Sequence, residues 1–184
     1  MVIQNGCVTL RAVEESDFDL LFYFINAPEI ESMTEGFHLP ISSSEQKKWM
    51  QNYSNTMSDI RLMIELNNGN TIGMIMLNDI DLVNGTASIS YKISAAPQDR
   101  IRGDMRDAIE GMLNFAFNEL RLNCVISAIL DYNVFSLKLV RKMHFTQEGV
   151  LRKRIYKNGE FHDQIVFSIL RSEFEEYKNK KGGV

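Results

Sequence analysis

Three consecutive segments with hydrophobic residues at every second position constrain the fold of this chain most strongly. These segments are residues 60–66, 72–76 and 87–93. A period of two is typical of strands with one buried face. Asparagine and glycine, which favour the tight turns of hairpins, separate the segments at residues 67–70 and at Asn84-Gly85. The pattern therefore predicts an antiparallel meander of three strands.

Strand and helix patterns alternate on either side of this meander. In chain order they are a strand at residues 8–13, a helix after Ser16, a helix opened by the capping-box pair Ser42 and Glu45, a helix from near Gly103, a strand at residues 124–130, a helix from Asn133 and a hairpin turning at Asn158-Gly159. The complete order is β-α-α-β-β-β-α-β-α-β-β. It predicts an α/β (α+β) domain with a mixed, mostly antiparallel central sheet and helices on both faces.

The length and composition are those of one globular domain. With 184 residues, of which 45% are hydrophobic and 24% charged, the chain can bury a core without disulfides or metals. We find no internal repeat and no interdomain linker, so we expect a single domain over residues 1–177. The polar segment KNKKGGV, residues 178–184, is expected to form a tail.

Composition also indicates which partners to expect. No apolar run reaches the roughly 20 residues of a membrane span, and the N-terminus lacks the layout of a secretory signal. We therefore expect a cytoplasmic protein without a membrane partner. The net charge of −4 argues against nucleic-acid binding, which requires phosphate neutralisation. Cys7 and Cys124 have no second cysteine or histidine at metal-ligand spacing, so we predict no metal site and interpret both as buried free thiols.

The segment PQDRIRGDM, residues 97–105, has the features of an anion-binding loop, because it joins the third meander strand to a helix. Exposed backbone N–H groups and the dipole of a helix N-terminus favour phosphate, and Arg100 and Arg102 add charged donors. An arginine followed three residues later by a glycine also occurs often by chance. A solvated loop is therefore the alternative interpretation.

The segment LDYNVFSLKLVRKMHF, residues 130–145, changes from a strand period to a helix period at Asn133. The side-chain oxygen of Asn133 can accept a hydrogen bond from a backbone N–H of the first turn, in which Ser136 lies. From this stretch alone, helix capping is the simpler interpretation, and contact with a ligand is the alternative.

Together these motifs resemble the GNAT superfamily of acyl-CoA-dependent N-acyltransferases, particularly the branch of ribosomal-protein N-terminal acetyltransferases and spermidine acetyltransferases. The resemblance extends over nearly the whole chain. The family's pyrophosphate-loop pattern Gln/Arg-x-x-Gly-x-Gly/Ala falls on Arg100, Gly103 and Met105. The later family pattern falls on Asn133, Ser136, Phe145, Glu148, Gly149 and Arg152, with His144 in place of the glycine before the phenylalanine.

The resemblance implies a splayed sheet with acetyl-CoA bound at the splay. The pantetheine arm would lie between the strand ending near Ala95 and the strand before Asn133, hydrogen-bonded to strand backbone, and Asn133 would contact this arm while still capping its helix. A backbone N–H near Ile93 to Ala95 is the implied oxyanion donor. The implied cofactor-binding residues are Ile93, Ser94, Ala95, Arg100, Ile101, Arg102, Gly103, Asp104, Met105, Asn133 and Ser136.

The implied reaction is an acetyl-CoA-dependent N-acetylation, in which a primary amine attacks the thioester directly and no metal is needed. The implied partners are acetyl-CoA and an amine acceptor, either a small molecule or a protein N-terminus, and a homodimer is the candidate assembly. We expect Ser136 to be the catalytic residue that protonates the leaving thiolate, because Val140 stands where many family members carry a tyrosine acid.

Acidic residues near the expected acceptor pocket complete the hypothesis. Glu31, Glu35 and Asp81 are candidates for binding or deprotonating the amine, with a solvated surface position as the alternative for each. Ser88 stands roughly where many relatives carry an acid on the third meander strand. Because this acid and the tyrosine are missing, and because Met105 is bulky, the alternative function is a non-catalytic protein that binds CoA or a protein partner.

Overall fold

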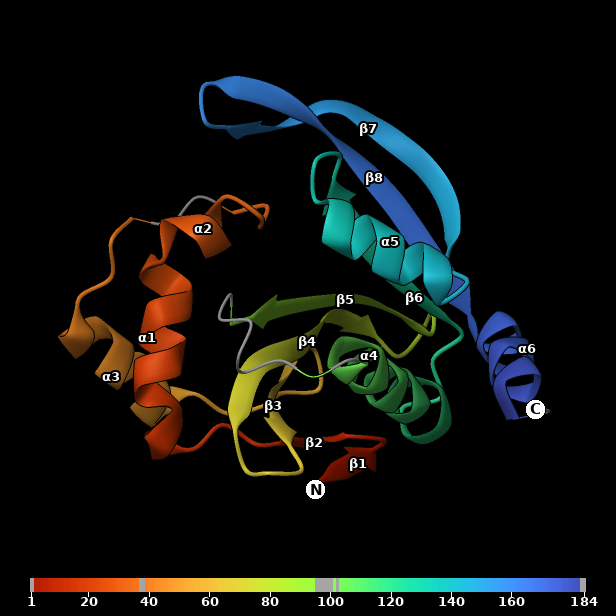
Figure 1. Cartoon of the computed structure of the whole chain (residues 1–184), viewed down its shortest axis with the longest axis horizontal. Helices are drawn as coiled ribbons and strands as arrows, with labels where there is room; N and C mark the ends of the chain where they lie inside the picture. Colours follow the sequence, from red (N-terminus) through yellow and green to blue (C-terminus); the bar gives the residue numbers. More distant parts are fainter. Residues whose placement is uncertain (1, 37–38, 95–100, 102, 183–184) are drawn as a thin grey trace.

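The computed structural model describes residues 2–36, 39–94, 101 and 103–182 (Figure 1). The strands are β1 (Ile3–Asn5), β2 (Val8–Arg11), β3 (Ile60–Leu66), β4 (Thr71–Asp81), β5 (Thr86–Ile93), β6 (Cys124–Leu130), β7 (Thr146–Lys157) and β8 (Glu160–Leu170). The helices are α1 (Phe18–Asn26), α2 (Pro28–Glu31), α3 (Ser43–Asn52), α4 (Asp104–Asn114), α5 (Val134–Lys142) and α6 (Arg171–Gly182), with a 3-10 turn at Glu15–Asp17 and a π-helical turn at Phe115–Glu119.

All eight strands of the described chain form one open sheet in the order β1-β2-β3-β4-β5-β6-β8-β7. The pair β5 and β6 is parallel, and every other neighbouring pair is antiparallel. The predicted meander is β3-β4-β5, and its hairpin turns lie where the asparagine and glycine residues predicted them. The predicted mixed, mostly antiparallel sheet with helices on both faces is confirmed.

Strands β5 and β6 separate after a short contact. They pair only from Thr86 to Ser88 on β5 and from Cys124 to Ile126 on β6. Beyond that point β5 remains paired with β4 as far as Ile93, and β6 remains paired with β8 as far as Leu130. The sheet therefore divides into two parts, with a gap between two strands that are each well anchored on their other edge.

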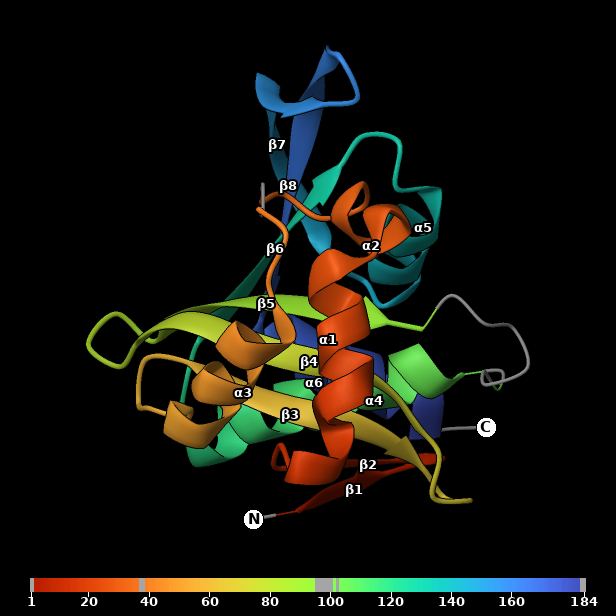
Figure 2. The same cartoon turned by 90° about the vertical axis from the view of Figure 1, so that its left-hand side faces the viewer.

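Helices cover the two faces of the sheet, and each face has its own hydrophobic core (Figures 1 and 2). The larger core packs α4 and α5 against one face and includes Ile64, Ile75, Leu77, Ile109, Met112 and Leu137. The smaller core packs α1 against the other face and is made of Leu21, Phe24, Ala27, Ile30, Met63, Met74 and Met76, with Trp49 of α3 at its margin. Alternate residues of β3 and β4 thus belong to different cores.

Helix α6 was not predicted from the sequence. Its composition is polar, and the sequence analysis placed residues 178–184 in a tail, whereas the helix continues through Gly182. Two aromatic residues one turn apart hold it to the domain: Phe174 is buried with its ring 5.5 Å from that of Phe117, and the Tyr177 hydroxyl donates to Glu110 of α4 at 2.5 Å. No helix in the described residues combines the length and the apolar composition that crossing a bilayer requires.

Candidate active site

The gap between β5 and β6 opens into the main cavity of the described chain, which has a volume of about 800 Å³. Residues of α1 and α3, the segment at residues 33–36, strands β3 to β6 and the first turn of α5 line it. The lining residues come from both faces of the sheet. Met74 and Lys92 belong to the face under α1, whereas Tyr91 packs with the larger core and reaches α5. A ligand in this cavity could therefore pass through the sheet.

The backbone of β5 presents polar groups to this gap. The N–H of Ser94 donates to the carbonyl oxygen of Ile72 on β4 at 2.8 Å. Because backbone N–H groups of a strand point alternately to its two edges, the N–H of Ile93 is directed toward the gap. The N–H of Ile93 is therefore accessible from the gap, whereas the N–H of Ser94 is bound within the sheet. Ala95 lies outside the described residues.

Asn133 caps helix α5, as predicted. Its side-chain oxygen accepts a hydrogen bond from the N–H of Ser136 at 3.2 Å. Its amide nitrogen donates to the carbonyl oxygen of Met33 at 3.4 Å, a long bond across the cavity to the segment after α2. Asn133 also lines the cavity, so this weak donor bond is the part of the side chain that a ligand could replace.

Ser136 is buried in the first turn of α5 and lines the cavity. The hydroxyl of Tyr91 on β5 donates to its Oγ at 2.8 Å. This bond leaves the proton of Ser136 available for a further acceptor, because a serine hydroxyl is both a donor and an acceptor. The pair forms a short chain of two hydroxyl groups that ends in the cavity.

Tyr91 is the residue that sequence reasoning missed. It alternates with Ile89 and Ile93 and was interpreted as an ordinary member of a buried strand face. Its hydroxyl reaches Ser136 only because β5 and β6 separate, and a strand pattern gives no sign of that separation. Val140, the position expected to carry a tyrosine, is 2% exposed and belongs to the larger core. The phenol of this site thus comes from the sheet and not from α5.

The predicted pyrophosphate loop is only partly described. Arg100 and Arg102 lie outside the described residues. Gly103 has a φ of 99°, which favours glycine, and precedes the first residue of α4. The carboxylate of Asp104 accepts hydrogen bonds from the N–H of Ile101 at 3.2 Å and from the N–H of Met105 at 2.6 Å.

These contacts give the surroundings of three predicted cofactor-binding residues, Ile101, Asp104 and Met105, whose role stays a prediction. The backbone N–H groups of Ile101 and Met105 are occupied by a carboxylate, which an anion would have to displace. Asp104 is 3% exposed and stabilises the positive end of α4 in place of a phosphate. Met105 is 2% exposed, and its side chain packs in the larger core.

The three acidic residues predicted to bind the amine, Glu31, Glu35 and Asp81, have different surroundings. Of these three, only Glu35 lines the cavity, and its side chain is exposed. The carboxylate of Glu31 pairs with the buried ammonium of Lys157. Asp81 accepts hydrogen bonds from Val83 N–H and Asn84 N–H, each at 2.9 Å, so it organises the turn between β4 and β5. Glu31 and Asp81 are therefore engaged elsewhere and are not among the described residues that line the cavity, so their role in substrate binding stays a prediction.

Two cations line the cavity beneath α3. Arg61 of β3 lies with its guanidinium carbon 5.6 Å from the ring centre of Trp49 and 5.5 Å from that of Tyr53. Lys92 of β5 lies on the same face of the sheet, and its burial, together with the charge of Arg61, lowers the pKa of its ammonium group. Asp79 of β4, at a φ of 51°, contributes an exposed carboxylate to the rim.

Within the described residues, no group of three or more histidine, cysteine or acidic side chains is arranged to hold a metal ion. The two cysteines are partly buried free thiols that lie apart, at the turn after β1 and at the start of β6.

Comparison with known proteins identifies the family of this site. The sequence model of the acetyltransferase (GNAT) domain matches residues 8–146. The chain belongs to the GNAT acetyltransferase family. The matched range runs from β2 to the first residue of β7, so it includes the splayed strands and the turn from Asn133 to Ser136.

Relatives cover almost the whole GNAT chain. The SPbeta prophage-derived uncharacterized N-acetyltransferase YokL of Bacillus subtilis (strain 168) is 30% identical over 91% of this chain and 92% of that protein. The putative ribosomal N-acetyltransferase YdaF of the same bacterium is 29% identical over 93% of this chain and 95% of that protein. The crystal structure of spermidine N-acetyltransferase from Vibrio cholerae in complex with CoA and spermine matches the fold, with a TM-score of 0.83 at 24% identity, over 93% of this chain and 99% of that chain.

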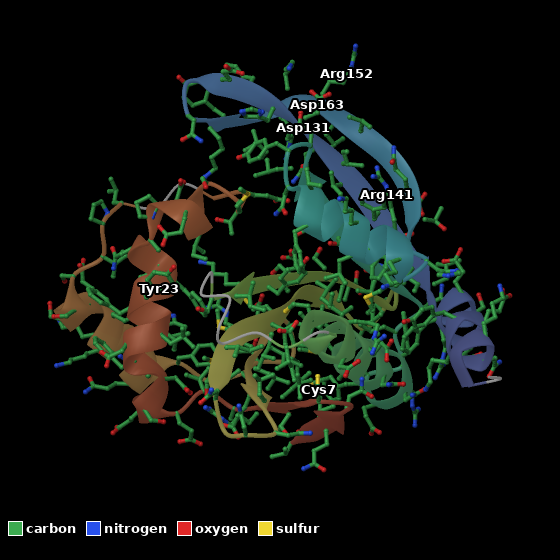
Figure 3. All side chains as sticks on the ribbon, in the orientation of Figure 1. Cys7, Tyr23, Asp131, Arg141, Arg152 and Asp163 are labelled. Atoms are coloured by element: carbon green, nitrogen blue, oxygen red, sulfur yellow. The ribbon has the colours of Figure 1, made fainter. Side chains whose placement is uncertain are left out.

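Two further positions of the GNAT pattern have clear structural settings. His144 replaces a glycine and has a φ of 63°, which explains why glycine suits this position at the end of α5. Arg152 is exposed on β7 and points outward from the β7–β8 hairpin (Figure 3). The structure therefore gives Arg152 no contact with the cavity.

Proposed function

We propose that this GNAT enzyme acetylates a primary amine in the described cavity, with acetyl-CoA bound along the gap between β5 and β6. The observation that supports this most strongly is the end of strand pairing at Ser88 and Ile126, while each strand continues. An extended pantetheine arm could pair with the exposed edge of β5 as an added strand does. When bound, acetyl-CoA supplies the activated thioester. Arg100 and Arg102 keep their proposed role at its pyrophosphate.

The residues around the gap fit the charges that develop during acyl transfer. The N–H of Ile93 is directed toward the gap and would stabilise negative charge on the carbonyl oxygen. Ser136 would donate its proton to the departing sulfur atom and regain one from solvent, and Tyr91 would hold the Ser136 hydroxyl in position through the 2.8 Å bond. In this scheme Ser136 is the catalytic residue and Tyr91 is a positioning residue.

The attacking amine must lose its proton before it reacts. Three carboxylates line the cavity, those of Glu35, Glu45 and Asp79. Glu45 is engaged in the capping box at the start of α3, where its carboxylate accepts from the N–H of Ser42 at 2.8 Å. We therefore propose Glu35 and Asp79 as the groups that attract the amine and accept its proton.

The reasons for a non-catalytic function are weaker than the sequence alone indicated. The tyrosine missing at Val140 has a counterpart in Tyr91, which binds the predicted acid Ser136 directly. The bulky side chain of Met105 is buried in the larger core, which supports a loop that it does not crowd. The strand acid missing at Ser88 has a neighbour in Asp79, which a bulge in β4 brings to the same cavity.

The identity of the acceptor and the assembly are further proposals. The name of YdaF refers to a ribosomal acceptor, which supports keeping a protein N-terminus beside a small-molecule amine. Assembly as a homodimer is supported by exposed hydrophobic residues on the β7–β8 hairpin, among them Tyr156 and Phe161, which are 60% and 57% exposed. Sedimentation of the purified chain would test this assembly.

The thermal unfolding midpoint with and without acetyl-CoA tests the binding part of this proposal. A ligand at about 100 times its Kd adds roughly 2.7 kcal/mol to the free energy of unfolding, which is about 5–10 °C for a chain of this size. ATP serves as a polyphosphate control. We expect a rise with acetyl-CoA that is smaller in Asn133→Ala, because the amide that faces the gap is lost. An equal rise with ATP, or none with either ligand at millimolar concentration, would contradict the proposed site.

A further inference from the structure

The charges that line the acceptor side of the cavity are of both signs, and their arrangement is informative. The carboxylates of Glu35, Glu45 and Asp79 belong to exposed residues at the rim. The two cations, Arg61 and Lys92, belong to half-buried residues deeper under α3. A site that binds only a polycation would not place its buried charges with this sign, because they repel the ligand and are costly to bury without a partner.

Neither cation has an acidic partner within the described residues. The Nε of Arg61 is buried and makes no hydrogen bond there, and the guanidinium lies over the rings of Trp49 and Tyr53. Lys92 forms no ion pair with a described residue, and the charge of Arg61 adds to burial in lowering its pKa. Buried polar groups without a partner are rare in folded proteins, and a ligand is a common reason for them.

Strand register brings the two cations to the same place. Arg61 pairs with Met76, which pairs with Ser90, and the neighbouring row joins Met74 to Lys92. The two cationic residues thus lie diagonally across β4 on one face of the sheet, about 12 Å apart at their backbones. Side chains of this length converge over such a distance, so that a single anionic group could contact both.

We infer that the acceptor is an amine that also carries an anionic group, a carboxylate or a phosphate, which Arg61 and Lys92 hold while the amine faces the thioester. The inference rests on the proposed function and names the substrate class of the same site. Arg61 is suited to the anion because its planar fork of N–H donors matches carboxylate and phosphate oxygens, and the stacked aromatic rings fix its plane. The rim carboxylates would meet the ammonium end of such a zwitterion.

The test uses the full chain, saturating acetyl-CoA and matched acceptors. An ω-amino acid, an aminoalkyl phosphate, a diamine and an alkylamine of equal chain length are compared over several lengths by kcat/KM. We expect an anionic acceptor to exceed the diamine and the alkylamine at least about tenfold, the lower end for one charge-assisted hydrogen bond. The kcat/KM values of the amino acid and of the aminoalkyl phosphate show whether the site prefers a carboxylate or a phosphate.

Variants connect this preference to the two cations. In Arg61→Gln and in Lys92→Gln we expect the ratio of anionic acceptor to alkylamine to fall toward one. The control Lys142→Gln, which changes an exposed residue at the end of α5, should keep the wild-type ratio. A wild-type diamine rate equal to or above those of both the amino acid and the aminoalkyl phosphate, at every length, would overturn the inference and leave the proposed function standing. Failure of every amine, including a peptide N-terminus, would overturn the proposed function and the inference with it.

Discussion

The bond between Tyr91 and Ser136 allows the proposed chemistry to be tested in detail. Ser136→Ala removes the hydroxyl that we place beside the departing sulfur atom. A positioned general acid contributes about 10²–10⁴-fold to a rate, and a thiolate, with a pKa near 8.5, needs little help in leaving. We therefore expect kcat to fall by about 10²-fold, near the lower limit of this range.

Tyr91→Phe should have a smaller effect, because it removes only the group that orients Ser136. A neutral hydrogen bond such as this one of 2.8 Å is worth about 1 kcal/mol, which corresponds to roughly fivefold in kcat. Since Tyr91 acts through Ser136, the tyrosine change should have no further effect once Ser136 is alanine. The double variant should thus match Ser136→Ala, with a coupling free energy of about 1 kcal/mol.

The assay is CoA thiol release at saturating acetyl-CoA and acceptor, with the thermal midpoint of each variant as the folding control. A wild-type kcat in Ser136→Ala would remove this residue from the chemistry. A fivefold effect of Tyr91→Phe in both backgrounds would refute the positioning role, because independent residues contribute additively.

Three other predictions concern stability and reactivity. Lys157→Met should lower the free energy of unfolding by about 2 kcal/mol and raise the acceptor KM, because the Lys157 ammonium holds the Glu31 carboxylate and the carbonyl oxygen of Gly36 beside the cavity wall. Lys180→Met is the control, and a shift in the urea midpoint no larger than that of the control would contradict this role. His144→Gly should stabilise the chain by about 1 kcal/mol, because the left-handed backbone at φ 63° is strained for histidine, and a lower thermal midpoint would show that its ring contact with Tyr177 matters more. Burial, followed by the hydrogen bond to Asp107, raises the pKa of Cys7 to about 11, so alkylation of Cys7 at pH 8 should be about 100-fold slower than that of an ordinary thiol (Figure 3). Asp107→Asn should increase the alkylation rate. A wild-type rate equal to that of an ordinary thiol would contradict the assigned environment.

Local sequence signals predicted those parts of the fold that depend on near neighbours. The capping box of Ser42 and Glu45 is formed as expected, and so is the cap of Asn133 on Ser136. The meander strands also follow from alternation and turn residues alone. In each case the decisive contacts lie within a few positions of one another, so the pattern is visible in one stretch of sequence.

The parts that were missed depend on contacts between distant segments. Tyr91 and Ser136 are 45 residues apart in the sequence. The Lys157 ammonium binds Glu31 and Gly36, which are more than 120 residues away in the sequence. Helix α6 lacks a hydrophobic stripe and is held by Phe174 and Tyr177, so its polar sequence gave no helix signal. The role of Asp81 in its turn was not predicted, because an acidic residue in a loop looks the same in sequence whether it binds a ligand or organises a turn.

The central claim is that this cavity transfers an acetyl group from acetyl-CoA to an amine. The most direct test follows CoA thiol release by the wild-type chain with acetyl-CoA, with and without each acceptor amine, and identifies the acetylated amine by mass spectrometry. We predict release that depends on the amine, equals the amount of acetylated product and falls by about 10²-fold in Ser136→Ala. Release that is the same without any amine, or no release with every acceptor while acetyl-CoA still raises the unfolding midpoint, would contradict it.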